Sequence, residues 1–289
     1  MGLAVCATPI GNLEDVTLRV LGELAAAELV LCEDTRHTRV LLERHGVRAA
    51  RGALLSYHQH NEAKRVGEVL PRLLAGQRVA LVSDAGLPGV NDPGARLVRA
   101  ALEAGVPVSV LPGPSAVETA LVASGLVGEQ YRFVGWLPRR VKELRALWEE
   151  LAAWPHPVVG FESPRRVGAT LRSLAAVAPR REVAVCRELT KRFEEVVRGE
   201  AADVAALVGD GVKGEVTLVI GPAEAETRGG AGLASRAAVV AGESREARLV
   251  RAQAAVGRLV EAGCPRRVAV DVVADLCAVP RNELYRSSL

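Results

Sequence analysis

Five short segments hold residues whose types and spacing could do chemistry, and each of them follows an apolar run. They are Thr8–Asn12, Asp84–Gly94, Pro112–Ala116, Glu162–Arg166 and Arg187–Lys191. Small residues dominate the first three, so a ligand can approach the backbone closely and be held by its N–H and C=O groups. An adenine nucleoside suits such a site. The last two segments are basic and suit an anionic substrate such as a nucleic-acid backbone.

Three charged residues are candidates for proton transfer or for holding a charged group. Lys191 is one of only four lysines among 37 basic residues. It fits a cation that steers phosphate, a base made neutral by burial, or a solvated lysine at the start of a helix. Glu33 and Asp34 end an apolar run, where carboxylates either cap a helix or hold a hydroxyl or a cation.

Several common types of site are absent or weakly supported. No G-x-G-x-x-G follows the first apolar run and no G-x-x-x-x-G-K-[ST] occurs, which argues against a dinucleotide enzyme and a P-loop NTPase. The lack of G-x-S-x-G argues against an α/β-hydrolase. His58 and His60 would share one face of an extended segment, but no third ligand lies nearby in the sequence, so no metal site is expected.

The composition is that of a soluble globular protein, with 49% hydrophobic and 25% charged residues and a net charge of +3. This balance excludes a polycation. No run approaches the roughly 18 apolar residues that a membrane helix needs, and no secretory signal is visible. The five cysteines are scattered and odd in number, which argues against a disulfide framework and predicts a cytoplasmic protein in a reducing compartment.

The pattern of apolar runs predicts the scaffold that positions the five segments. In the first half, strand-like runs alternate with helical patterns about five times, which indicates an α/β lobe with a parallel or mostly parallel sheet. Ligands bind such sheets at the carboxyl ends of the strands. Asp92 before Pro93 predicts a helix start, and Ser115 with Glu118 has the spacing of a capping box.

A second α/β lobe and a helical tail follow. A polar, glycine-rich linker begins at residue 223, and helical patterns cover 234–262, 267–276 and 280–286. The tail fits a small nucleic-acid-binding appendage, or else a helical cap or dimerisation element. We therefore expect an N-terminal lobe over 1–118, a C-terminal lobe over 119–222, and a linker with a small helical domain over 223–289.

Six motifs, in this order along the chain, closely resemble those of one bacterial family, the RsmI family of 16S rRNA (cytidine-2′-O)-methyltransferases in the tetrapyrrole-methylase superfamily. They are Thr8-Pro-Ile-Gly-Asn-Leu-Glu-Asp15, Cys32-Glu-Asp-Thr-Arg36, Ser83-Asp-Ala-Gly-Leu-Pro-Gly-Val-Asn-Asp-Pro-Gly94, Pro112-Gly-Pro-Ser-Ala116, Phe161-Glu-Ser-Pro-Arg-Arg166 and Arg187-Glu-Leu-Thr-Lys191. The resemblance implies S-adenosylmethionine as cofactor, a cleft between two α/β lobes, and a homodimer. Its implied substrate is a decoding-centre cytidine of 16S rRNA in the small ribosomal subunit, with no metal and no membrane involved.

The resemblance also implies roles for individual residues. Those expected around the cofactor are Pro9, Asp84, Gly86, Leu87, Val90, Ser115 and Ala116. Those expected to bind the substrate are Asn12, Glu162, Arg166 and Arg187. The reaction would be an in-line attack by a ribose 2′-oxygen on a sulfonium methyl group, where positioning does much of the work and a base helps. Lys191 is the first candidate for that base, and Glu188 or Glu33 the second.

Three residues depart from the family pattern. Leu87 stands where threonine is usual, Asn91 where serine is usual, and Arg165 where histidine is usual; the last excludes a histidine from proton transfer at that place. Two other functions stay open: a relative in the same superfamily that methylates a tetrapyrrole or diphthine, and a non-catalytic ribosome-assembly factor. The Arg187–Lys191 motif and the helical tail argue against the first, and failure to bind S-adenosylmethionine would favour the second.

Overall fold

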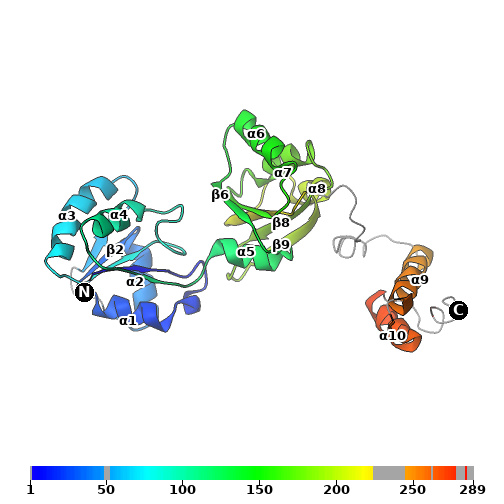
Figure 1. Cartoon of the computed structure of the whole chain (residues 1–289), viewed down its shortest axis with the longest axis horizontal. Helices are drawn as coiled ribbons and strands as arrows, with labels where there is room; N and C mark the ends of the chain where they lie inside the picture. The colour runs from blue at the N-terminus through cyan, green and yellow to red at the C-terminus, as the bar shows by residue number, and fades with distance from the viewer. Residues whose placement is uncertain (1, 49–52, 224–244, 262, 278–283, 285–289) are drawn as a thin grey trace. The chain divides into compact units, whose positions relative to one another are not determined.

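The computed structural model describes residues 2–48, 53–223, 245–261, 263–277 and 284. The chain divides into two compact units, residues 1–229 and 230–289 (Figure 1). The first unit contains two five-stranded sheets, and the second a pair of helices. None of the helices within the described ranges is long and apolar enough to cross a membrane.

The N-terminal lobe is built on a fully parallel sheet in the order β3-β2-β4-β1-β5. Its strands are β1 (Leu3–Cys6), β2 (Leu29–Cys32), β3 (Leu54–Ser56), β4 (Val79–Val82) and β5 (Val108–Leu111). The predicted parallel sheet is therefore confirmed. Because every strand runs in the same direction, the loops after β2, β4, β1 and β5 leave the sheet side by side at one edge.

Helices cover both faces of this sheet, which explains why its central strands are continuous apolar runs. On one face, α1 (Leu18–Ala26) and α2 (Thr35–Arg44) pack against Ala4 and Cys6. On the other, α3 (Glu62–Leu74) and α4 (Ala95–Glu103) pack against Leu3 and Val5. Alternate residues of one strand thus enter different cores.

Two helix starts differ from the sequence prediction. The helix α4 begins at Ala95, and its N-cap residue is Gly94, which has φ 144° and no side chain to cap the helix. Asp92 and Pro93 therefore lie in the preceding loop instead of at the N-terminus of the helix. The residue Ser115 does hold the N-cap position of α5 (Ala116–Ser124), but its hydroxyl donates to the Glu118 carboxylate and no side-chain cap to the backbone forms. Asn12 caps only a 3₁₀ turn, Leu13–Asp15, and Thr17 caps α1.

The C-terminal lobe has a mixed sheet in the order β6-β7-β10-β8-β9, in which β6 pairs with β7 in parallel and the other neighbouring strands pair antiparallel. Its strands are β6 (Arg132–Trp136), β7 (Val158–Glu162), β8 (Glu182–Arg187), β9 (Glu195–Glu200) and β10 (Val216–Ile220). The strand β9 was not predicted from the sequence. This edge strand carries Glu195, Arg198 and Glu200 on either side of its two adjacent valines, and charges of this kind protect a sheet edge while hiding the apolar pattern.

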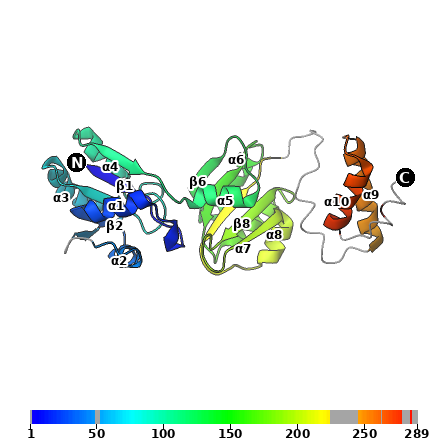
Figure 2. The same ribbon diagram turned by 90° about the horizontal axis from the view of Figure 1, so that it is seen from below.

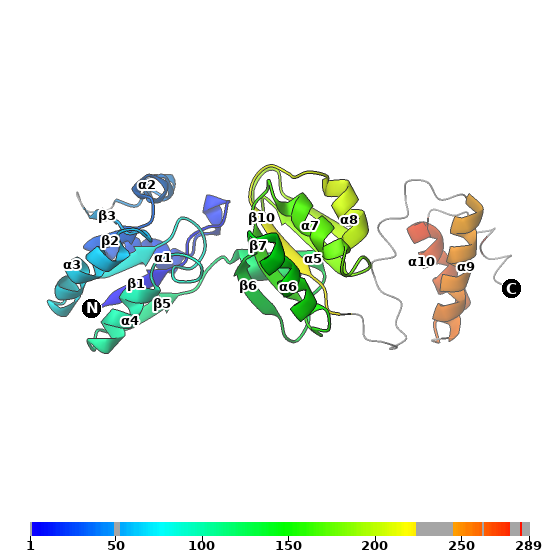
Figure 3. The same cartoon turned by 90° about the horizontal axis from the view of Figure 1, so that it is seen from above.

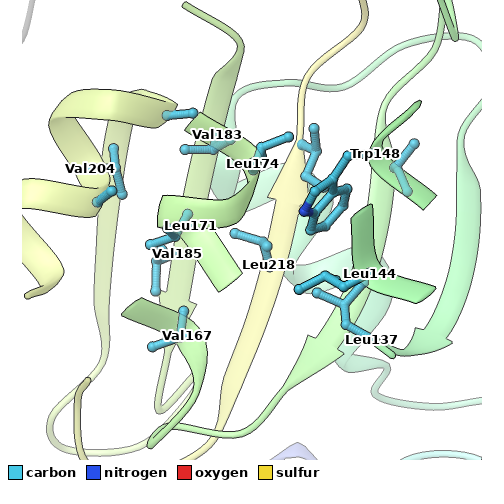
Figure 4. Packing of buried hydrophobic residues seen from close by; sticks show 14 of the residues in the cluster. Leu137, Leu144, Trp148, Val167, Leu171, Leu174, Val183, Val185, Val204 and Leu218 are labelled. Carbon is cyan, nitrogen blue, oxygen red and sulfur yellow. The ribbon is translucent and has the colours of Figure 1, made fainter. Parts of the chain in front are cut away.

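Three helices, α6 (Val141–Leu151), α7 (Val167–Ala175) and α8 (Ala201–Val208), lie on one face of this sheet, and α5 lies on the other (Figures 2 and 3). In the core between the sheet and these three helices, Trp148 is 1% exposed and is surrounded by aliphatic side chains (Figure 4). The opposite core joins α5 to Ala184 and Cys186 of β8. The helix α5 spans the predicted lobe boundary at 118/119 and packs on the second sheet; the boundary itself stays a prediction.

The second unit contains α9 (Arg245–Glu261) and α10 (Arg266–Cys277). They pack against each other through Val256, Val270 and Val273, with Leu284 completing the cluster. This agrees with the predicted helical patterns over the residues that are described. The predicted segments 234–244 and, apart from Leu284, 280–286 lie outside the described residues.

Candidate active site

All five chemistry-bearing segments contribute to one cavity of about 720 Å³. Its wall includes Ile10, the Asp84–Gly86 turn, Ser115, Glu162 and Leu189. The first three come from loops after β1, β4 and β5, which the strand order places side by side. The last two come from the carboxyl ends of β7 and β8. A volume of this size is typical of small-molecule and cofactor sites.

The cavity wall that belongs to the N-terminal lobe is formed largely by loop backbone, which hydrogen bonds hold in place. Thr8 and Gly86 form an isolated antiparallel bridge, with N···O distances of 2.8 and 3.0 Å. Gly86 has φ +76°, a conformation that glycine adopts without steric cost. At Gly113 a Cβ would lie 2.9 Å from that of Ala7. The loops therefore offer a cradle that side chains would fill.

Most of the residues predicted around the cofactor line this cavity. They are Asp84, Gly86, Leu87, Val90, Ser115 and Ala116. Pro9 is buried and does not line it, whereas its neighbour Ile10 does. Asn91, one of the three departures, has φ +61°, and asparagine enters this left-handed region more readily than serine. Arg165 is exposed and outside the cavity wall.

Three carboxylates from two loops, Glu33 after β2 and Asp84 and Asp92 after β4, line the same cavity. Burial, together with the charges of Glu33 and Asp84, raises the pKa of Asp92 to about 7. Burial likewise raises the pKa of Glu33, and the charge of Asp84 adds to this. Asp84 itself accepts a hydrogen bond from the Asp34 N–H at 3.0 Å and lies 3.1 Å from His37 Nδ1. The cavity thus has an acidic side that favours a cationic ligand.

Asp34 does not share this role. Its side chain accepts from the Arg36 N–H at 2.8 Å and caps α2, and the hydrogen bonds from Arg36 lower the pKa of Asp34. Of the paired carboxylates, Asp34 is therefore the helix cap and Glu33 is the residue in the cavity wall.

Lys191 lies in an ion-pair network at the edge of the cavity. Its Nζ is 2.9 Å from Glu215 Oε2 and 3.1 Å from Glu188 Oε1. Burial acts to lower the pKa of Lys191, but hydrogen bonds and charges from Glu215 and Glu188 outweigh it and raise the pKa overall. Of the alternatives for Lys191, this arrangement favours a cation over a base made neutral by burial, and its role in the reaction stays a prediction.

The loop that carries Lys191 has an unusual backbone. Glu188 and Thr190 have φ of +52° and +64°, which non-glycine residues rarely adopt. The Asn12 N–H donates to Thr190 Oγ1 at 2.9 Å, so this loop contacts the loop after β1. At Gly11 a Cβ would lie 2.5 Å from Lys191 Cγ. The contact between the two loops fixes Lys191 and requires glycine at position 11.

The other residues predicted to bind the substrate have internal partners. Glu162, 1% exposed, accepts from the Ser163 N–H at 2.6 Å and from the Thr170 hydroxyl at 2.5 Å, and it lies 3.3 Å from Arg166. Arg187 pairs with Glu195 at 3.0 Å and does not line the cavity. Their roles in substrate binding stay predictions.

Sequence reasoning missed the aromatic side of the cavity. Tyr131, Phe133 and Trp136 come from β6 and the residue before it, and Phe161 from β7. The ring centroids of Phe133 and Trp136 lie 5.1 and 5.7 Å from that of Phe161, edge to face. The low aromatic content of 3% hid the signal, which was that several of the few aromatic residues lie in one stretch, 131–136. The run Gly214–Thr217 was also missed.

The cavity fits S-adenosylmethionine on its chemistry. Glycine-rich backbone and apolar side chains suit an adenosyl group, and the acidic side suits a sulfonium and an amino group. Within the described ranges, no group of three or more His, Cys, Asp or Glu residues is arranged to hold a metal ion.

Comparison with known sequences places the chain in one family. A sequence profile described as Tetrapyrrole (Corrin/Porphyrin) Methylases matches residues 2–205. The chain is 46% identical over 227 residues to ribosomal RNA small subunit methyltransferase I of Mesorhizobium japonicum, which spans 78% of this chain and 76% of that protein. It is 41% identical over 281 residues to the protein of the same name from Micromonospora olivasterospora, across 96% and 83% of the two chains.

Solved structures share the fold at lower identity. Uroporphyrin-III C-methyltransferase from Thermus thermophilus, in complex with S-adenyl homocysteine, superposes with a TM-score of 0.52 at 21% identity. The match covers 76% of this chain and 97% of that one. It supports the two-lobed α/β architecture.

Proposed function

The chain belongs to the tetrapyrrole methylase family and, within it, to the ribosomal RNA small subunit methyltransferase I proteins, and from this membership we propose that it methylates the 2′-oxygen of a cytidine in 16S rRNA. The cofactor is S-adenosylmethionine. The observation that carries the proposal is the convergence of all five predicted segments on one cavity, with Lys191 at its edge. Small ribosomal subunits are the proposed substrate, and the cytoplasm is the proposed location.

The residues proposed to hold the cofactor are those of the cavity's glycine-rich wall. Gly86 and Ala116 allow close approach of a ligand to the backbone, and Asp84 offers a carboxylate to a cationic group. When bound, S-adenosylmethionine supplies a methyl group on a positively charged sulfur. The carboxylates of Glu33 and Asp92 add negative potential on the same side of the cavity.

The remaining work is to place a ribose hydroxyl and to take its proton. We propose that Lys191, aligned by Glu188 and Glu215, contacts the 2′-oxygen. As an ammonium it donates to that oxygen, and only after losing its own proton can it accept the hydroxyl proton. Glu33, whose raised pKa makes it a stronger base than an ordinary carboxylate, is the alternative acceptor.

The reaction is tested by nucleoside mass spectrometry. Small subunits from a strain that lacks this gene are incubated with purified protein and S-adenosylmethionine, then digested and compared with untreated subunits. New 2′-O-methylcytidine is the expected product. No methylated nucleoside, from protein that binds the cofactor, would overturn the proposal in favour of a small-molecule or protein substrate. The homodimer also stays a prediction, which sedimentation velocity would test.

A further inference from the structure

An exposed indole stands at the mouth of the cavity. Trp136 lines the cavity and yet is 62% exposed, whereas Trp148 is buried and Trp154 is half-buried. Exposure alone says little, because isolated apolar residues such as Leu207 also lie on the surface. The geometry around Trp136 is more specific.

A β-bulge turns Trp136 toward the cavity. The β6–β7 register shifts between Phe133 and Trp136, and Gly135 between them has φ +68°. In a regular strand, residues three apart point to opposite faces. Here both rings contact Phe161, at 5.1 and 5.7 Å between centroids. Bulges that re-aim a side chain in this way are common beside active sites.

Hydrogen bonds fix the backbone that follows the indole. The Leu137 N–H donates to the Phe161 carbonyl at 3.0 Å, and Arg166 Nη2 donates to the Pro138 carbonyl at 2.6 Å. Arg166 is itself held by the buried Glu162 at 3.3 Å. Trp136 is therefore presented by a rigid support before any ligand arrives.

Two exposed cationic residues follow Trp136 within six positions of the sequence. Arg139 and Lys142 are exposed, and neither forms an ion pair with any residue that the structure describes. In contrast, Arg140 between them pairs with Glu143 at 2.9 Å. Aromatic faces that stack on unpaired bases, with cations beside them for phosphates, are the means by which proteins hold single-stranded RNA.

We propose that Trp136 stacks on a nucleobase of the RNA substrate and that Arg139 and Lys142 contact its backbone. This inference rests on the proposed function and adds a subsite to it. The indole offers its exposed surface to solvent, from which an RNA strand approaches. A base stacked there would bring its ribose to the mouth of the cavity.

Tryptophan fluorescence tests the stacking directly. Full-length protein is titrated with a cytidine-containing single-stranded RNA oligonucleotide and, separately, with S-adenosylhomocysteine, and the same titrations are made with Trp136→Phe. The expected result is quenching by RNA that Trp136→Phe largely abolishes, and little quenching by S-adenosylhomocysteine. Equal quenching in both proteins would overturn the proposal. Quenching by S-adenosylhomocysteine alone would assign the indole to the adenine of the cofactor instead.

Steady-state kinetics on small ribosomal subunits provide the second test, which holds even if free RNA binds weakly. Trp136→Ala should raise KM for subunits about tenfold with kcat nearly unchanged. Trp136→Phe, which keeps an aromatic ring, should have a KM close to that of the wild type. Leu207→Ala is the control. An unchanged KM in Trp136→Ala would refute this subsite while leaving the methyltransferase activity intact, whereas an inactive wild type would refute the proposed function.

Salt dependence tests the cations. Arg139→Gln should lower the slope of log K against log salt for the RNA by about one, because one fewer counterion is released. Arg99→Gln, a change on the exposed side of α4, should leave the slope unchanged. An equal slope in wild type and Arg139→Gln would remove Arg139 from the subsite.

Discussion

The ammonium of Lys191 lies 2.9 Å from a carboxylate oxygen of Glu215, a contact that joins the loop between β8 and β9 to the residue before β10. The two segments are interlocked further. The Glu215 N–H donates to Glu188 Oε1, and the Glu188 N–H donates to the Glu215 carbonyl, both at 3.0 Å. Since Glu215 also lines the cavity, the network places the charge of Lys191 at its edge.

Lys191→Met should lower kcat about 10²- to 10⁴-fold, the usual cost of losing a general acid or base. Affinity for S-adenosylmethionine should stay within about threefold, because Lys191 is not part of the cavity wall. Single-turnover methylation and calorimetry measure the two effects. Near-normal turnover with the cofactor bound would exclude Lys191 from the chemistry.

Glu215→Gln separates a basic role of Lys191 from a cationic one. Hydrogen bonding and charge from Glu215 raise the pKa of Lys191, so removing them should lower it. If Lys191 takes the proton, the rising limb of the pH–rate profile should move to lower pH in Glu215→Gln. A profile that keeps its position would assign proton transfer to another group, with Glu33→Gln as the next variant.

Alanine substitutions at Gly11 and Gly22 are a matched pair of variants that tests the contact between the loop after β1 and the loop after β8. A Cβ at Gly11 would lie 2.5 Å from Lys191 Cγ and 2.9 Å from the Leu189 carbonyl, whereas nothing lies within 4 Å at Gly22 in α1. Gly11→Ala should therefore impair catalysis by displacing Lys191. Gly22→Ala should stabilise the protein by about 0.5–1 kcal/mol. Urea unfolding and kcat test both, and equal kcat for the two variants would contradict the first expectation.

The architecture and the cradle could be predicted from the sequence because they are encoded locally. Alternating strand-like and helical runs indicated the parallel sheet, and a parallel sheet brings the ends of β1, β4 and β5 together. Glycines such as Gly86 marked the loops where a backbone turns sharply. These features depend on residues that are near one another in the chain.

The rest could not be predicted, either because it depends on contacts between distant segments or because the local pattern is weak. The pairing of Lys191 with Glu215 raises the pKa of the lysine, and nothing in either segment indicates the other. The cavity position of Asp92 became clear only when α4 was seen to begin at Ala95. The charged edge strand β9 carried too weak an apolar pattern to be recognised.

Removal of the buried Glu162 carboxylate should destabilise the fold. Glu162→Ala leaves Arg166 without its buried partner and Thr170 without an acceptor, so we expect a loss of about 3–5 kcal/mol in the free energy of unfolding. Glu149→Gln, which breaks an exposed pair with Arg145, should cost less than about 1 kcal/mol. Urea unfolding of both variants measures the difference. Similar losses would mean that Glu162 has no structural role beyond that of a surface ion pair.

Discrimination between S-adenosylmethionine and S-adenosylhomocysteine should depend on pH through Asp92. The pKa of Asp92 is raised to about 7 by burial and by the charges of Glu33 and Asp84, so this side chain is neutral below pH 7 and anionic above it. The two ligands differ in the positive charge on sulfur. Raising the pH from 6 to 8 should therefore favour S-adenosylmethionine several-fold, because the Asp92 carboxylate in the cavity wall becomes charged. Calorimetric Kd values for both ligands at the two pH values measure the ratio, which Asp92→Asn should flatten and Asp203→Asn, a change at an exposed residue of α8, should not. A ratio that changes equally in Asp92→Asn would show that another group titrates.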